Sequence, residues 1–154
     1  MTAYTLAYGM PILAEVPPPR DLSRFTDWPL TVEFIDGRRW RVHQDISYRT
    51  GAGEVSTVRA GFVFDFASIP RLLWPLAAPA GDGHNLYGLA AVWHDWLYKH
   101  RKIGGRMITR READALFLEI MLYVGVRPWL ARAMYGAVRT FGNFFGKNRA
   151  PRDS

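Results

Sequence analysis

The residues best suited to do chemistry are His94, Asp95 and Tyr98, which lie within the apolar segment Ala90–Tyr98. In a helix, residues four apart share a face, so His94 and Tyr98 point the same way. Asp95 is rotated from them by about 100° and can serve another purpose. Because an unpaired polar group is costly to bury in apolar surroundings, the His94–Tyr98 face requires a partner.

A partner carboxylate follows in the segment Arg111–Phe117. Asp114 has apolar residues at i+3, i+4 and i+7, which places it at the border of the apolar stripe of a second helix. A carboxylate there would accept hydrogen bonds from His94 and Tyr98, fix the imidazole tautomer and leave the other ring nitrogen to take a proton from water. The pattern predicts a general-base dyad. The alternative is a structural His–Tyr–Asp network that ties two helices together without a substrate.

Asp65 and Ser68 are further candidates for the wall of a site, at the transition from a strand to a loop. Asp65 would be an oxygen ligand or a polar wall, or it would cap the following turn through the N–H of Ser68. No Gly-x-Ser-x-Gly motif surrounds Ser68, so it is not expected to be a nucleophile. The spacing of the four histidines argues against zinc. Calcium takes only oxygen ligands, which Asp95 and backbone carbonyls can provide.

The composition predicts one folded domain. The chain has 154 residues, of which 49% are hydrophobic, and no cysteine, so disulfides and thiolate metal sites are excluded. The longest apolar runs are interrupted by proline and glycine and are too short to span a bilayer. The N-terminus carries no basic region before an apolar stretch, so we expect no signal peptide.

Charge is unevenly distributed along the chain. Residues 1–98 carry 8 Lys/Arg and 10 Asp/Glu, whereas residues 99–154 carry 12 Lys/Arg and 4 Asp/Glu. A basic half favours contact with an anionic partner such as lipid headgroups or nucleic acid, although no nucleic-acid-binding module is recognisable. The alternative is that these charges belong to solvated helix faces and a basic tail.

The pattern along the chain predicts an α+β fold with a small N-terminal antiparallel sheet, a helical hairpin and a third, C-terminal helix. We expect a Pro-rich irregular arm over residues 1–29, a single domain over 30–146 and a basic flexible tail over 147–154. The strands are expected as a hairpin turning at Asp36-Gly37, followed by one or two more. Their segments are Leu30–Ile35, Arg38–His43, Ile46–Arg49 and Val55–Phe64.

Three helices are expected after the strands. The first runs to about His100 from a cap at Asp82 or Asn85, and the basic segment Lys102–Arg106 forms a loop. Thr109 and Glu112 form a capping box that begins the second helix, which ends near Val124 with Gly125 as its C′ residue. Pro128 suits the first turn of the third helix.

Three segments, Phe64–Arg71, Ala91–Tyr98 and Arg111–Phe117, together resemble an uncharacterised family, a domain of unknown function found in phages, prophages and related bacterial gene clusters. The resemblance covers about residues 30–142. It implies a phage-type gene neighbourhood and synthesis in the bacterial cytoplasm, but no established activity.

The motif His94-Asp95-x-x-Tyr98 is also similar to the His-Asp-x-x-Tyr helix of secreted phospholipase A2 enzymes. The segment that carries Asp114 resembles their second catalytic helix, above all that of the bacterial and fungal type. This resemblance implies that His94 is the general base and Asp114 its orienting partner. It implies that Tyr98 donates to Asp114 and that Asp95 binds calcium. The calcium ion would polarise an ester carbonyl and stabilise the oxyanion.

Two departures from the phospholipase pattern are visible. Those enzymes are secreted and disulfide-linked, whereas this chain has no cysteine. Their Gly-rich calcium loop lies shortly before the histidine helix, and the corresponding stretch here, Pro75–Gly83, is no clear match.

The sequence supports three hypotheses. The first is a calcium-dependent esterase of phospholipase A2-like mechanism acting at an anionic membrane. The second is a non-catalytic virion or tail component that contacts other virion subunits through residues 1–29 and the basic tail. The third is a cell-wall hydrolase or peptidase that uses the same residues. An apolar pocket reaching the imidazole of His94 favours the first hypothesis, and complete burial of His94 favours the second.

Overall fold

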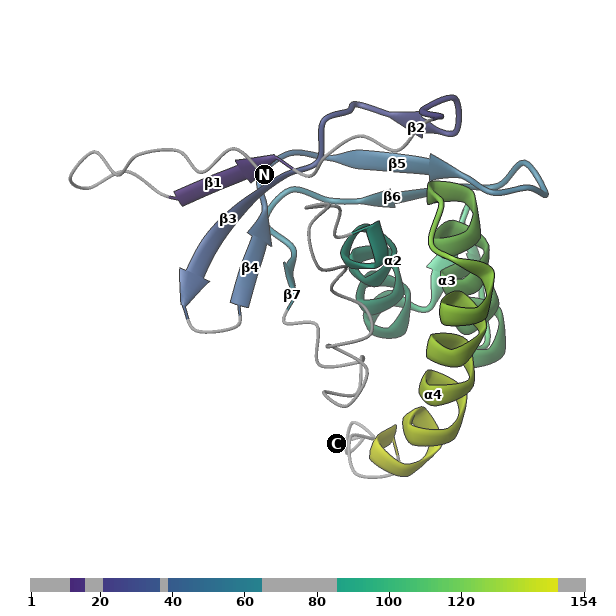
Figure 1. Cartoon of the computed structure of the whole chain (residues 1–154). Helices are drawn as coiled ribbons and strands as arrows, with labels where there is room; N and C mark the ends of the chain where they lie inside the picture. The colour runs from purple at the N-terminus through teal and green to yellow at the C-terminus, as the bar shows by residue number, and fades with distance from the viewer. Residues whose placement is uncertain (1–11, 16–20, 37–38, 65–85, 147–154) are drawn as a thin grey trace.

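Antiparallel strands precede three helices, so the fold is α+β as the sequence predicts (Figure 1). The computed structural model describes residues 12–15, 21–36, 39–64 and 86–146. The predicted tail over 147–154, the helix caps Asp82 and Asn85, and the candidates Asp65 and Ser68 lie outside these residues.

One sheet has four antiparallel strands in the order β1-β3-β4-β7. Its central hairpin pairs Val32 with Val42 and Phe34 with Trp40, which confirms the hairpin predicted around Asp36. The strands are β1 (Ile12–Glu15), β3 (Thr31–Asp36), β4 (Arg39–Val42) and β7 (Val63–Phe64).

A second antiparallel sheet has the order β2-β5-β6, where one small sheet was predicted. Its strands are β2 (Phe25–Thr26), β5 (Ile46–Arg49) and β6 (Val55–Val58). The predicted strand segment Val55–Phe64 divides between the two sheets. A turn closed by the hydrogen bond from Phe62 N–H to Arg59 O (3.2 Å) contains Gly61 at φ 85°, and it directs the chain from β6 to β7. Glycine adopts this left-handed conformation without steric cost.

The irregular conformation predicted for residues 1–29 is wrong for two short segments. Strand β1 pairs with β3, and strand β2 pairs with β5. Phe25 in β2 is buried and packs against Tyr48 and Trp93, with ring centroids 5.1 and 5.6 Å away. The prolines that suggested an arm flank these strands rather than interrupt them, and burial of Phe25 favours the pairing.

The described residues contain three helices, α2 (Leu86–His100), α3 (Arg110–Val124) and α4 (Pro128–Gly146). Thr109 and Glu112 form the predicted capping box, and Gly125 ends α3 at φ 99°. The predicted loop Lys102–Arg106 is instead a hairpin of β8 (Lys102–Ile103) and β9 (Arg106–Met107), because two consecutive glycines with positive φ turn the chain back.

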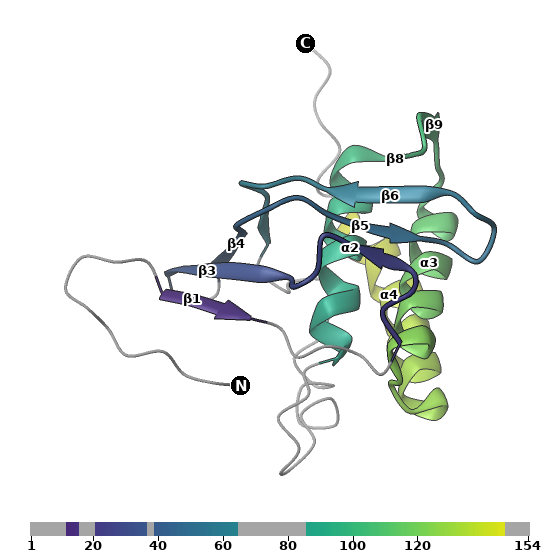
Figure 2. The ribbon, with the colours of Figure 1, turned by 90° about the horizontal axis from the view of Figure 1, so that it is seen from above.

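The helices pack in sequence, α2 on α3 and α3 on α4, and the sheet β2-β5-β6 crosses above α2 and α3 (Figure 2). Trp93 of α2 is fully buried and donates from Nε1 to the carbonyl of Ser56 in β6 (3.2 Å). On α3, Glu119 accepts hydrogen bonds from the hydroxyl of Tyr48 (3.0 Å) and the N–H of Gly51 (2.8 Å). These contacts fix α2 and α3 under one sheet, and α4 packs on another part of α3.

Two glycine substitutions compare a glycine that ends α3 with a glycine in the interior of α4. Gly125→Ala places a side chain in the left-handed region and should lower the free energy of unfolding by about 1 kcal/mol. Gly136→Ala, inside α4 with open space around its added methyl group, should raise it by about 0.5–1 kcal/mol. Urea unfolding followed by circular dichroism measures both, and changes of the same sign would contradict this account.

Candidate functional site

A buried hydrogen-bond network joins the three helices. His94 and Tyr98 lie one turn apart on α2, and both donate to Oδ1 of Asp114 on α3, from Nε2 at 2.8 Å and from the hydroxyl at 2.5 Å. His94 is 1% exposed and Asp114 is 0% exposed. The structure therefore brings together the three residues that the sequence predicts as the dyad and its tyrosine.

Arg139 of α4 completes the network, and sequence reasoning missed it. Its guanidinium donates to Oδ2 of Asp114 at 2.9 Å, while its side chain stays 33% exposed. The sequence did contain a signal for Arg139. A buried carboxylate such as Asp114 needs a cationic partner, and Arg139 directly follows Val138 in the apolar stripe of α4. That partner lies 25 residues from Asp114, and no spacing rule connects two such positions.

The network holds Asp114 ionised. Burial by itself raises the pKa of the Asp114 carboxyl, but the hydrogen bonds from His94, Tyr98 and Arg139 together outweigh it, so the pKa lies below its ordinary value. Burial, and then the hydrogen bond to this carboxylate, raise the pKa of Tyr98 well above its ordinary value. The phenol therefore stays protonated and acts as a donor. Since an ionised carboxylate can only accept, Nε2 of His94 carries a proton.

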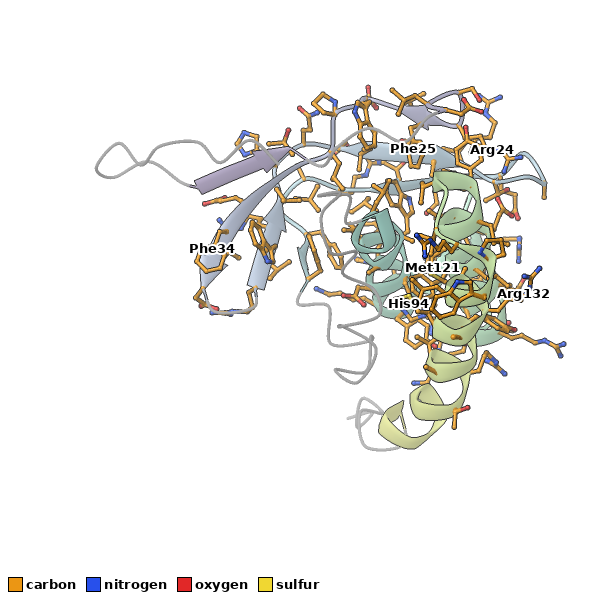
Figure 3. The ribbon with its side chains drawn as sticks, in the orientation of Figure 1. Arg24, Phe25, Phe34, His94, Met121 and Arg132 are labelled. Carbon is orange, nitrogen blue, oxygen red and sulfur yellow. The ribbon has the colours of Figure 1, made fainter. Side chains whose placement is uncertain are left out.

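The second ring nitrogen of His94, Nδ1, is buried and has no hydrogen-bond partner among the residues that the structure describes. The imidazole lies between two aromatic rings, those of Tyr98 and Phe117, with centroids 4.2 and 4.7 Å from its own. Figure 3 shows His94 on the side of α2 that faces α3 and α4. In the neutral tautomer that carries its proton on Nε2, the lone pair lies on Nδ1, and a general base requires such a lone pair.

The predicted calcium ligand Asp95 is half-buried and lies one residue along α2 from His94. Among the residues that the structure describes, no group of three or more His, Asp or Glu side chains could hold a metal ion. Within the same residues, no helix is both long and apolar enough to cross a membrane.

The fold and the network define an α+β protein whose three helices are joined by a buried His–Asp–Tyr–Arg network. The chain belongs to the family described as "Protein of unknown function (DUF1353)", whose sequence pattern matches residues 40–138. This range includes His94, Tyr98 and Asp114, and it ends one residue before Arg139. Comparison with curated proteins and with solved structures gave no match.

The depressed pKa of Asp114 predicts a pH dependence of stability. The ionised carboxylate stabilises the fold fully above about pH 4, the ordinary pKa of aspartate, and this contribution is lost as the pH falls through the lower pKa of the folded state. We expect the free energy of unfolding of the native chain to decrease more steeply than that of Asp114→Asn between about pH 5 and pH 3. Urea unfolding at each pH measures the difference.

The comparison with Asp114→Asn isolates one carboxyl group. The exposed carboxylates paired with arginine, such as Asp36 and Asp45, are present in both proteins, so their titration cancels. Parallel stability curves for the two proteins would show that Asp114 is not held ionised by the network.

Proposed function

We propose that this DUF1353 protein is a hydrolase of lipid esters in which His94 acts as the general base. The observation that carries the proposal is the asymmetry of the imidazole. Nε2 is bound to Asp114 at 2.8 Å, whereas the buried Nδ1 has no partner within the described part of the chain. A purely structural histidine is expected to satisfy both nitrogens, because an unmade hydrogen bond in the interior is costly.

The proposed step is proton transfer from water to Nδ1 of His94. The oxygen of that water forms a bond to the ester carbonyl carbon, and collapse of the tetrahedral intermediate breaks the bond to the alcohol oxygen. The imidazolium then returns its proton to the departing alkoxide, so protons and charge balance. Asp114 stabilises the imidazolium in between, and Tyr98 and Arg139 are positioning residues because they hold Asp114.

Access to Nδ1 requires a local opening, since His94 is 1% exposed. Exposure increases along the network, from buried His94 and Asp114 to half-buried Tyr98 and to Arg139. Movement of the half-buried side chains would admit a water and an ester group to the ring. We also propose that the activity depends on calcium and that the partner is an anionic membrane. None of the proton-transfer steps described above requires the calcium ion.

A non-catalytic role is the second candidate, and the near-complete burial of His94 and Asp114 favours it. In that case the network only holds α2, α3 and α4 together. The protein would then be a virion or tail component whose partners are other virion subunits. Removing the lone pair of Nδ1 while keeping the donor at Nε2 distinguishes the two roles.

The variant His94→Gln meets this requirement, because the glutamine amide can donate to Asp114 but offers no base. We expect the native chain to release fatty acid from mixed phospholipid vesicles. The rate of release by His94→Gln should be at least about 100-fold lower, because the variant has no general base. Thermal unfolding of the variant should stay close to that of the native chain. His100→Gln, in the exposed last turn of α2, is the matched control and should keep full activity.

Each assay is run with calcium and with a chelator, which tests the predicted calcium dependence separately. Release of fatty acid that persists in His94→Gln would place the base elsewhere. Absence of release from every lipid class by the native chain would overturn the hydrolase proposal and leave the structural role.

A further inference from the structure

The β8–β9 hairpin projects from the end of the helical layer where α2 stops and α3 begins (Figure 2). Its turn, Gly104-Gly105, is open: apart from the chain neighbours, no atom of the described residues lies within 4 Å of a Cβ placed on either glycine. The base of the hairpin is held in place, because Ile103 is buried and Arg106 forms ion pairs with Glu54 and Glu112. The hairpin is therefore an anchored projection with an exposed tip.

A large apolar side chain lies on this projection. Met107 of β9 is 64% exposed, more than any other large apolar residue that the structure describes. Its cross-strand partner is Lys102 of β8, so the two side chains stand next to each other on one face of the hairpin. That face combines an apolar group with a cation, which fits the boundary between lipid headgroups and acyl chains.

Positive charge gathers around the hairpin without carboxylates to balance it. Residues 99–111 contain no Asp or Glu. Arg101 directly precedes β8 and is half-buried, whereas Lys102 and Arg111 are exposed. Within the described part of the chain, no carboxylate forms an ion pair with any of these three side chains. Together with Met107 they form the hairpin surface (Arg101, Lys102, Met107 and Arg111), whose charge is complementary to an anionic partner.

The hairpin surface adjoins the candidate site. The guanidinium carbon of Arg101 lies 5.8 Å from the centre of the Tyr98 ring, and the centre of the His94 ring lies 4.2 Å from the same point. Tyr98 is half-buried, whereas His94 is buried. A partner bound at the hairpin surface would therefore lie next to the more exposed side of the network.

We propose that the hairpin surface is the face by which this protein binds an anionic membrane. Met107 enters the boundary between headgroups and acyl chains, and the three cations lie against lipid phosphates. This binding brings the bilayer next to Tyr98, a placement that rests on the proposed function because it names the docking face for the lipid substrate.

The charge alone would also match a nucleic acid, but the other features of the surface favour a bilayer. A phosphodiester backbone would leave Met107 without an apolar partner. Single-stranded nucleic acids are held by aromatic side chains on which bases stack, and none of the four residues of the hairpin surface is aromatic.

The test measures binding without turnover, by co-sedimentation of the full chain carrying His94→Gln with vesicles of phosphatidylglycerol or of phosphatidylcholine. A chelator is present, so that calcium bridges do not contribute. We expect binding to phosphatidylglycerol that weakens as salt is added, and at least about tenfold weaker binding to phosphatidylcholine. Lys102→Gln and Met107→Ser should each weaken the binding to phosphatidylglycerol about fivefold, through loss of one cation and of one inserted apolar side chain.

Arg127→Gln and Leu122→Ser are the matched controls. They remove the same charge and a comparable apolar side chain, both exposed, near the other end of α3. Helix α3 has 15 residues, so its two ends lie about 20 Å apart. Both controls should change vesicle binding less than about twofold. Absence of binding to phosphatidylglycerol, or losses in the controls equal to those in the hairpin variants, would overturn the proposal.

A fluorescent label reports directly which side chain enters the bilayer. The chain has no cysteine, so a single one can be introduced and labelled. In Met107→Cys, an environment-sensitive dye should shift its emission to shorter wavelength on phosphatidylglycerol vesicles, whereas the same dye in Leu122→Cys should not. A shift in Leu122→Cys without one in Met107→Cys would place the membrane at another face and reject the hairpin surface.

A DNA duplex is the competing probe. Binding of DNA that depends on Lys102, by a chain that does not bind phosphatidylglycerol vesicles, would assign the hairpin surface to nucleic acid and contradict the proposal.

The outcome is separable from that of the hydrolase assay. Vesicle binding that depends on the hairpin surface, by a chain that releases no fatty acid, would keep the docking face and reject the proposed hydrolysis. Fatty-acid release from phosphatidylglycerol that depends on His94 but is unchanged in Lys102→Gln and Met107→Ser would keep the hydrolase and reject the docking face.

Discussion

The requirement to compensate one buried carboxylate organises the helical half of this protein. Asp114 lies in the interior, where an uncompensated charge would cost several kcal/mol, so each of its oxygens must be matched by donors. The donors come from both neighbouring helices, His94 and Tyr98 from α2 and Arg139 from α4. Satisfying Asp114 therefore specifies the rotation of α2 and α4 about α3, which apolar packing alone would leave less strictly defined.

The rest of the fold holds α3 in place so that this compensation is possible. The capping box at Thr109 begins the helix and Gly125 ends it, which sets where the chain turns toward α4. Glu119, on another face of α3, accepts hydrogen bonds from Tyr48 in β5 and from Gly51 shortly after that strand. Arg106 of β9 forms ion pairs with Glu54 and Glu112, and so connects the β8–β9 hairpin to the start of α3. Helix α3 is thus bound to the sheet and to both other helices.

The geometry that stabilises the fold is also the basis of the proposed chemistry. The ionised carboxylate holds a proton on Nε2 of His94, so in the neutral imidazole the lone pair lies on Nδ1, between aromatic rings. The guanidinium groups of Arg101 and Arg110 lie over the ring of Tyr98, 5.8 and 5.4 Å from its centre. In the proposed mechanism, stability and reactivity depend on the same few hydrogen bonds, so the informative variants keep the contact with Asp114 and change one other property.

Local features of the sequence determined the elements. The Asp36-Gly37 turn, the Thr109–Glu112 capping box, Gly125 and Pro128 each act within a few residues. The hairpin, the bounds of α3 and the start of α4 were therefore predictable. The shared face of His94 and Tyr98 follows from helical periodicity, and the apolar neighbours of Asp114 indicated its burial. Tertiary structure alone decided the division into two sheets, the pairing of β2 with β5, and the arrival of Arg139 at Asp114 and of Arg101 and Arg110 at Tyr98. These contacts join residues whose separations no local period encodes, and they form only when helices and sheets pack against each other.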